Sequence, residues 1–389
     1  MLVVVTSFLA AAFPRAVDAY GTEGLRHDIR TASPRVSVLE LASPAPGLEI
    51  PQADRETGLR PETLTRAQQA LVKALPAPLR VDPAQSTHGV RSSDGLEASD
   101  AWLPKPDGLP PLFTLAAQAD LGGHSTVRAG RLPAARGQVT QETTQVEAAA
   151  TPETAKSLHL RVGSVIHVPG NIHGPVAVRI TGIVAPRQPA GAYWSVEQVL
   201  STPSLTVKST GDPSTYWRAG LLIAPEAAPA LLGVKGGPEL YWRLAPDPTA
   251  LTWQDVPRLE SGLASVDGGP GLIKLRAVAG GRSQLSLTTD LDTVISSYSA
   301  MRSAVTPIVA VAAFGIGAVA VVVLTMSGGL IAARRRSELA LLRSRGGSLR
   351  GIGGRLLAET AVVAVPSAAL GLLLAVLAVG EARLLPALL

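Results

Sequence analysis

Apolar residues are concentrated in two long runs near the C-terminal end of the chain. Residues 308–333 form a run of 26 positions without an ionisable side chain, and residues 360–380 form a second run of 21 positions. A bilayer core about 30 Å thick needs about 20 helical residues, so each run predicts a transmembrane helix, with a buried core helix as the alternative. Pro366 lies inside the second run, where a membrane helix tolerates it if neighbours satisfy the freed carbonyl.

Small residues recur four positions apart within both runs. Ala313 and Gly317 form one such pair, and Ser367 and Gly371 form the other. This spacing predicts places where helix backbones approach each other closely.

A third apolar run, residues 2–13, opens the chain but is only 12 residues long. It would give about 18 Å of helix, too little to cross a bilayer. One interpretation is a signal peptide, with Val17-Asp18-Ala19 as a small-x-small cleavage site. The other is the outer half of a first span that starts upstream, and the missing basic n-region favours this second interpretation.

Charge is unevenly distributed, and this predicts an orientation. The net charge is +5, but residues 301–389 contain nine Arg and only three acidic residues. Seven of these Arg lie between Arg334 and Arg355, in the connector between the two long runs, and positive connectors mark the cytoplasmic side. Residues before 308 are therefore expected outside the cytoplasm. A nucleic-acid partner is not expected, because the basic excess lies between two apolar runs and not on a folded face.

The region before the long runs shows mixed helix and strand signals, which predict an α+β domain. A helix is expected over residues 61–75, and residues 83–111 are expected to form a loop or a subdomain boundary. Thr151 precedes Pro152 and Glu153, the pattern of a helix start, and that helix is expected to close near His159. Strands are expected over residues 162–168 and from Val176, where apolar residues alternate with others.

Residues 284–306 contain neither Pro nor Gly. Leu285, Thr288, Leu291, Ile295 and Tyr298 lie roughly along one face of a helix at this spacing. The pattern predicts a stalk helix that continues into the first long span.

Motifs for enzymatic chemistry are missing from the sequence. It contains no G-x-x-x-x-G-K-[ST] phosphate loop, no G-x-S-x-G elbow and no H-E-x-x-H motif, so neither an enzyme nor a cofactor is predicted. The chain has no cysteine, which removes disulfides and thiolate metal sites. His167 and His173 flank a predicted turn and are expected to be exposed loop residues, not metal ligands. Four Trp of the extracytoplasmic region are expected mainly as core anchors: Trp194, Trp217, Trp242 and Trp253.

The connector string RRRSELALLRSRGGSLRGI resembles the segment after the second span of FtsX-like and MacB-like ABC-transporter permeases. Residues 130–195 are similar to the extracytoplasmic domain of MacB-type permeases. The resemblance implies an α+β domain of periplasmic type inserted between the first and second spans of a multi-pass cell-membrane protein. It implies these segments: 1–14, partial first span; 15–284, extracytoplasmic domain; 285–306, stalk helix; 307–333, span; 334–359, cytoplasmic coupling segment; 360–380, span; 381–389, extracytoplasmic end.

The same resemblance implies the partners, which are a separate ABC ATPase subunit, a second permease copy or half, and membrane lipid. Residues 338–348 would include a short coupling helix seated on the ATPase. The implied ATPase-coupling residues are Glu338, Leu339, Leu342, Arg343, Arg345, Gly346 and Ser348. A family unit has four spans, whereas this chain offers half of the first, the second and the third. A membrane-anchored extracytoplasmic binding or sensor protein without an ATPase is the alternative function.

Overall fold

A computed structural model of the chain describes residues 1–172, 174–208, 213–334 and 349–381. The chain forms two compact units. The helical unit comprises residues 1–25, 252–254 and those from 296 onward, and it contains the long apolar helices. The sheet unit comprises residues 26–251 and 255–295, and it is a mixed α/β structure built on one large sheet.

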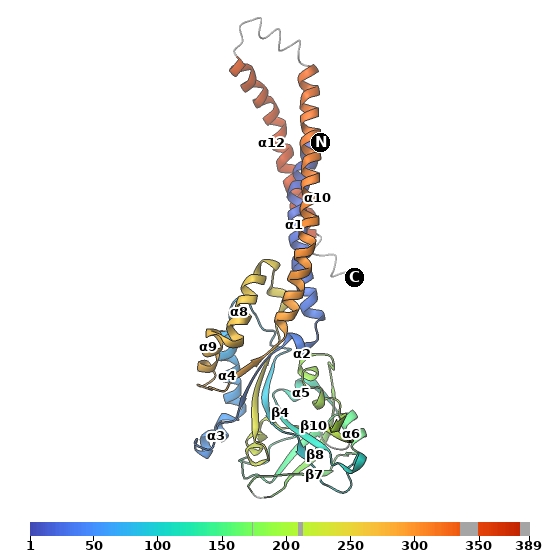
Figure 1. Ribbon diagram of the computed structural model, residues 1–389, viewed down its shortest axis with the longest axis vertical. Coiled ribbons are helices and arrows are strands. Elements are labelled where there is room, and N and C mark those ends of the chain that lie inside the picture. The colour runs from blue at the N-terminus through green and yellow to red at the C-terminus, as the bar shows by residue number, and fades with distance from the viewer. Residues whose placement is uncertain (173, 209–212, 335–348, 382–389) are drawn as a thin grey trace. The chain divides into compact units, whose positions relative to one another are not determined.

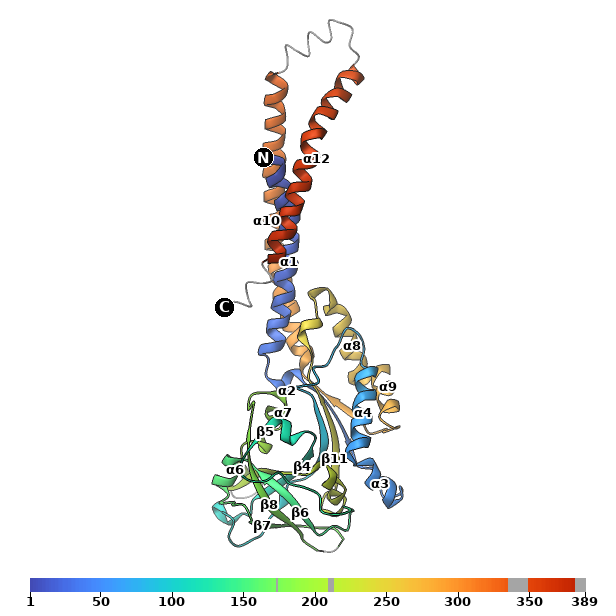
Figure 2. The ribbon, with the colours of Figure 1, turned by 180° about the vertical axis from the view of Figure 1, so that it is seen from behind.

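Three helices of the described chain are long and apolar enough to cross a membrane. They are α1 (Leu2–Thr31), α10 (Leu291–Arg334) and α12 (Leu349–Glu381). Figures 1 and 2 show their apolar segments side by side. Side chains such as Ile308 and Val311 are about 70% exposed, an arrangement that lipid can cover but water disfavours.

Two helix boundaries differ from the sequence prediction. The helix that begins at Leu2 continues through Pro14 to Thr31, past the boundary expected at residue 14 between a partial span and the following domain. The predicted helix over residues 284–306 begins later, because Ser286–Thr288 form strand β12 beside β1 (Leu39–Pro44). From Leu291 the residues of the predicted stalk and of the first long apolar run form one helix, as the uninterrupted pattern predicts.

The sheet contains twelve strands in the described part of the chain, in the order β12-β1-β11-β2-β4-β10-β6-β8-β5. Strand β3 pairs with β4, β7 with β8 and β9 with β10 off this path. Most pairs are antiparallel, but β4 with β10 and β6 with β8 are parallel. The remaining strands are β2 (Thr87–Ser92), β3 (Leu96–Glu97), β4 (Leu112–Gln118), β5 (Ser125–Gly130), β6 (Gln145–Ala150), β7 (Val165–Val168), β8 (Val176–Pro186), β9 (Ser204–Lys208), β10 (Ser214–Ile223) and β11 (Pro238–Leu244).

Short helices surround the sheet. The α-helices are α2 (Pro34–Ser37), α3 (Gln52–Gly58), α4 (Pro61–Ala74), α5 (Leu121–His124), α6 (Pro152–Ser157), α7 (Ala192–Ser195), α8 (Val256–Gly268) and α9 (Pro270–Val278). The 3-10 turns are η1 (Pro106–Gly108), η2 (Gln198–Leu200), η3 (Pro225–Gly233), η4 (Pro248–Ala250) and η5 (Trp253–Asp255). Helix α4 packs against β2 and α9, and α8 packs against α9 and β12.

Helix α4 confirms the predicted amphipathic helix. Leu64 and Leu71 are buried on its inner face, and Pro61 stands at its first turn as expected for a helix start. The indole Nε1 of Trp242 on β11 donates a hydrogen bond of 3.1 Å to the carbonyl of Leu64. This buried bond fixes the helix on the sheet while satisfying the indole N–H.

Helix α6 also follows its sequence signal. The hydroxyl of Thr151 accepts a hydrogen bond from the backbone N–H of Thr154, which is an N-cap, and Pro152 opens the helix. The helix ends at Ser157, two residues before the expected position, and His159 adopts a positive φ of 56°. Strand β8 starts at Val176 as predicted.

The loop predicted over residues 83–111 is wrong, because it contains the central strand β2 and the short β3. The sequence of β2, Thr-His-Gly-Val-Arg-Ser, lacks apolar alternation, yet most of its side chains are buried. Several of its polar side chains have partners on other elements: Ser92 accepts from the backbone N–H of Leu115 on β4 at 3.2 Å, and Nε2 of His88 lies 3.1 Å from the hydroxyl of Thr65 on α4. Arg91 illustrates this with three carboxylate partners.

Two of the four Trp considered from sequence are core anchors. Trp194 and Trp242 are 2% and 0% exposed, whereas Trp217 and Trp253 are half-buried. Trp194 packs with Tyr193 in a cluster that also contains Leu121. The core therefore depends on the aromatic residues of α7 and β11.

Candidate functional site

The residues that the resemblance assigns to ATPase coupling lie outside the described residues. They are Glu338, Leu339, Leu342, Arg343, Arg345, Gly346 and Ser348. The described helices on either side end at Arg334 and begin at Leu349, so the coupling assignment stays a prediction from sequence.

Tyr298 and Gly371 each mark a close contact between two of the long helices. The hydroxyl of Tyr298 on α10 donates to the carbonyl of Gly21 on α1 at 2.7 Å. A Cβ at Gly371 on α12 would lie 2.5 Å from the carbonyl oxygen of Val4, so only glycine permits this approach to α1. No heavy atom of the described chain lies near a Cβ built at Gly317, so of the two small-residue pairs the second contains a contact residue.

Aromatic and cationic side chains meet where the apolar run of α10 begins. The guanidinium of Arg302 lies 3.7 Å from the ring centroid of Trp253, a cation–π contact. Its Nη1 also lies 3.5 Å from the hydroxyl of Tyr298. Trp, Tyr and Arg at the end of an apolar helix are typical of a membrane–water interface.

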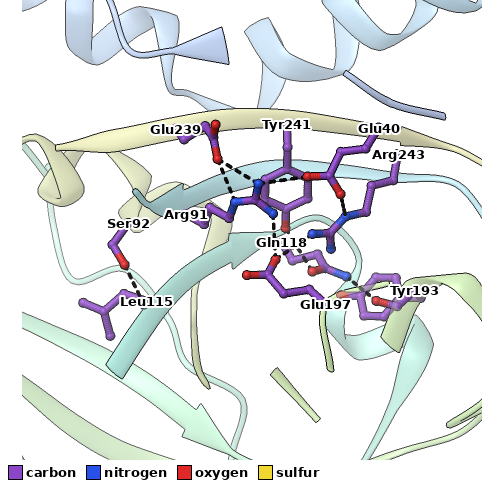
Figure 3. Close-up of polar contacts among 10 residues, drawn as sticks. All are labelled: Glu40, Arg91, Ser92, Leu115, Gln118, Tyr193, Glu197, Glu239, Tyr241 and Arg243. Carbon is purple, nitrogen blue, oxygen red and sulfur yellow. Dashed lines mark hydrogen bonds and ion pairs between the residues drawn. The ribbon is translucent and has the colours of Figure 1, made fainter. Parts of the chain in front are cut away.

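A network of five charged residues, one buried and four partly buried, lies in the sheet unit (Figure 3). It consists of Glu40 on β1, Arg91 on β2, Glu239 and Arg243 on β11, and Glu197 just after α7. Arg243 donates to Glu40 at 2.8 Å and to Glu197 at 2.6 Å. Arg91 contacts Glu40 at 2.8 Å, Glu197 at 3.0 Å and Glu239 at 2.8 Å. Two arginines thus bridge three strands and one loop through shared carboxylates.

The charges of this network stabilise one another. Burial alone would raise the pKa of Glu40, but the charges of Arg243 and Arg91 outweigh it and hold that pKa below its usual value. Burial opposes the charge of Arg91, yet the carboxylates of Glu197, Glu40 and Glu239 raise its pKa. The pairing therefore keeps Glu40 and Arg91 in their charged forms and offsets the cost of burying them.

Tyr241 extends the network by way of a neutral hydrogen bond. The guanidinium of Arg243 lies 4.4 Å from the Tyr241 ring centroid, and the phenol hydroxyl donates to Gln118 at 2.9 Å. Gly89 stands opposite Tyr241 on β2, and a Cβ there would lie 2.7 Å from the phenol oxygen. Glycine at this position therefore leaves room for the ring to cross β2.

Gln118 connects this network to a pair of stacked rings. Its side-chain amide donates to the carbonyl of Tyr193 at 3.0 Å. The Tyr193 ring stacks on His124 with centroids 4.0 Å apart, and its hydroxyl donates to the carbonyl of Ala119 at 3.0 Å. The contacts run without interruption from Arg243 to His124, which lines a cavity.

That cavity, of about 550 Å³, lies beside α4 at one end of β2 and β4. Residues Thr65, Gln68, Gln69, Val72 and Lys73 of α4 line it, at the spacing of one helix face. The opposite lining comes from β2, from the segment that precedes it and from the residues around α5. The volume lies within the usual range of small-molecule sites.

His88 on β2 is the most buried titratable group that lines the cavity, at 7% exposure. Burial lowers the pKa of His88 to about 4, so the ring is uncharged at neutral pH. Thr65 donates its hydroxyl proton to the carbonyl of Pro61 at 2.8 Å, and the same oxygen lies 3.1 Å from His88 Nε2. Because that hydroxyl has one proton, Nε2 must be the donor and Nδ1 is left as an acceptor.

A second cavity of about 340 Å³ is lined by Glu147 and Arg136. Arg131 and Arg136 each donate to Glu147 at 2.6 Å, and the backbone N–H of Ala134 donates at 3.2 Å. The hydrogen bond from Arg131 is the main cause that lowers the pKa of Glu147 to about 2. These contacts fix the segment after β5 against β6 and leave the carboxylate fully engaged.

The described residues contain no group of three or more His, Asp or Glu that could hold a metal ion. His167 is half exposed, and its Nδ1 lies 2.8 Å from an oxygen of Asp100. His173, its neighbour across the predicted turn, lies outside the described residues.

No family model matches the chain, and no curated protein matches it. The sites above therefore depend on geometry alone. Neither the charge network nor the cavity was predicted from sequence, since their members are far apart in the chain and form no motif. The one available signal was the polar composition of β2, which places Arg91 and His88 in a strand that is buried.

Proposed function

We propose that this chain is the transmembrane subunit of an ATP-driven ABC transporter of FtsX or MacB type. In this proposal α1, α10 and α12 cross the cell membrane and the sheet unit lies outside the cytoplasm, between the first two spans. ATP-dependent movement of a separate ATPase would reach the sheet unit through the continuous helix α10. Export of a substrate or mechanical control of an outside partner would follow.

The observation that carries this proposal is the order of elements along the chain. An apolar helix precedes the sheet unit and a 44-residue helix follows it. The basic connector Arg334–Arg355 comes next in the sequence, and its last residues, from Leu349, already belong to the third apolar helix. The Glu338–Arg343 string in this connector supplies apolar and charged residues suited to a partner groove. A second copy of the permease, or a second half, would be a further partner in the membrane.

Capture of the ATPase tests the coupling residues. Leu339→Asp with Leu342→Asp is expected to abolish co-purification, from detergent-solubilised membranes, of a protein with a G-x-x-x-x-G-K-[ST] loop identified by mass spectrometry. A matched control is Leu205→Asp with Val207→Asp, since both side chains are more than half exposed on β9. If the unchanged chain, the Leu339/Leu342 variant and the control variant capture the ATPase equally, the coupling assignment is overturned.

The cysteine-free sequence allows a clean test of orientation. Lys156→Cys in the sheet unit is expected to react with a membrane-impermeant maleimide added to intact cells. Ser344→Cys in the basic connector is expected to react only after the membrane is permeabilised. The reverse pattern would refute the orientation, and labelling of both in intact cells would refute the membrane crossing of α10.

The cavity beside α4 favours a second candidate function, a membrane-anchored binding or sensor protein without an ATPase. This candidate expects a ligand at the cavity and no ATPase among the captured proteins. Capture of an ATPase that depends on Leu339 and Leu342 would decide against it.

A further inference from the structure

The cavity beside α4 combines an apolar lining with two charged groups of opposite sign. Lys73 comes from α4 and Asp120 from the residue before α5, and both line the same space. Within the described part of the chain the Lys73 ammonium has neither a hydrogen bond nor an ion pair, and the Asp120 side chain is 71% exposed. A cation and an anion held on different elements match a ligand that carries both charges at separate positions.

The carboxylate of Asp120 is held in place from two sides. Its Oδ1 accepts the backbone N–H of Gly123 at 3.1 Å, which caps α5, and its Oδ2 lies 3.7 Å from His124 Nε2. His124 is in turn stacked on Tyr193, which the network holds. These contacts restrict the position of the Asp120 carboxylate before any ligand binds, which is the preorganisation that a binding site requires.

Neutral hydrogen-bonding groups lie between the charged ones. Gln68 and Gln69 line the cavity, and neither side-chain amide has a hydrogen bond within the described residues. Each amide offers both a donor and an acceptor, which is the pattern that a peptide bond presents. Val72 and Val81 add apolar surface for an aliphatic side chain.

We propose that this cavity binds a short apolar peptide with free termini, its carboxylate at Lys73 and its ammonium at Asp120. The amides of Gln68 and Gln69 would contact the peptide bond, and the unprotonated Nδ1 of His88 would accept from a ligand N–H. A phosphate or other simple anion is disfavoured, because the Asp120 carboxylate would repel it. This inference stands independently of the transporter proposal.

Titration calorimetry on the detergent-solubilised full chain tests the proposal with four probes: Leu-Leu, N-acetyl-Leu-Leu, Leu-Leu-amide and inorganic phosphate. Leu-Leu is expected to bind. N-acetyl-Leu-Leu, which lacks the ammonium, and Leu-Leu-amide, which lacks the carboxylate, are each expected to bind about tenfold more weakly, because each loses one charge contact of about 1.4 kcal/mol. Phosphate is expected not to bind. No binding of Leu-Leu, or equal binding of the blocked forms, overturns the proposal.

Two variants assign the charges to their sites. Lys73→Met is expected to remove the preference for a free carboxylate, and Asp120→Asn the preference for a free ammonium. Asn keeps the cap of α5 and tolerates the positive φ of 53° at this position, so the second variant should fold. The matched controls Lys156→Met and Glu153→Gln on α6 are expected to bind as the unchanged protein does. If the Lys73 and Asp120 variants keep both preferences, the assignment is wrong even where Leu-Leu binds.

Discussion

Glu40 and Arg243 stand directly opposite each other on β1 and β11, and a hydrogen bond of 2.8 Å joins them. Arg243 is 1% exposed, and its removal leaves the partly buried carboxylates of Glu40 and Glu197 to share the single guanidinium of Arg91. Arg243→Met is expected to destabilise the sheet unit by about 3–5 kcal/mol. Urea unfolding of the full chain in detergent, followed by tryptophan fluorescence, measures the loss. Arg218→Met, at an exposed position on β10, serves as the control and is expected to change stability by about 0.5 kcal/mol or less. If the two variants unfold at the same midpoint concentration of urea, the prediction is contradicted.

The hydroxyl of Thr151 has two structural tasks. It accepts from the N–H of Thr154 as the N-cap of α6 and donates to the carbonyl of Ser201 at 2.7 Å. Thr151→Ala is expected to cost about 1–2 kcal/mol in the same urea experiment, whereas Thr151→Ser keeps the hydroxyl and should cost less. A serine variant as unstable as the alanine variant would show that the methyl group and not the hydroxyl matters.

His88 makes the stability of the sheet unit depend on pH. Its folded-state pKa of about 4 lies below the ordinary 6.5, so between these values the unfolded chain binds a proton that the folded chain does not. The contribution is fully present above pH 6.5 and declines as pH falls toward 4, by up to about 3 kcal/mol. His88→Gln should flatten stability over that window in urea titrations at successive pH values. An unchanged slope would show that His88 is not the group responsible.

Gly371 and Gly317 differ sharply in their surroundings although both belong to small-residue pairs. Gly371→Leu is expected to lower the apparent melting temperature in detergent, because overpacking against α1 costs about 1–3 kcal/mol. Gly317→Leu meets open space in the described chain and is expected to be tolerated. Equal melting temperatures for the two variants would mean that α12 and α1 do not pack as described.

Helices were predicted well where the sequence supplies local signals. Pro61 and Thr151 mark helix starts through their own backbone and hydroxyl chemistry, and both helices begin where expected. Strand β2 was missed because its stability comes from partners on other strands, such as Glu40 and Glu239 for Arg91. The spacing over residues 284–306 predicts helix at 286–288 as well, because a strand of three residues carries too little periodicity to be distinguished.

The candidate sites were less accessible from sequence. Glu197 and Arg91 are separated by more than a hundred residues and meet only because the sheet brings β2 and the segment after α7 together. Lys73 reads as an ordinary exposed helix residue, and only the fold places it in the same cavity as Asp120. The proposed coupling residues from Glu338 to Ser348 differ from these sites, because they are contiguous in the chain and can be recognised from the sequence alone.

The pairing of β1 with β12 has a consequence for how this protein could change over evolution. These are the first and the last strands of the sheet along the described chain, and Leu41 stands opposite Leu287, so the two strands lie about 5 Å apart near the start and the finish of the unit. A domain whose ends are adjacent can be removed or exchanged without disturbing the segments on either side. The sheet unit could therefore be exchanged for another domain during evolution. The long helices would be kept while the part of the protein that recognises a partner changed.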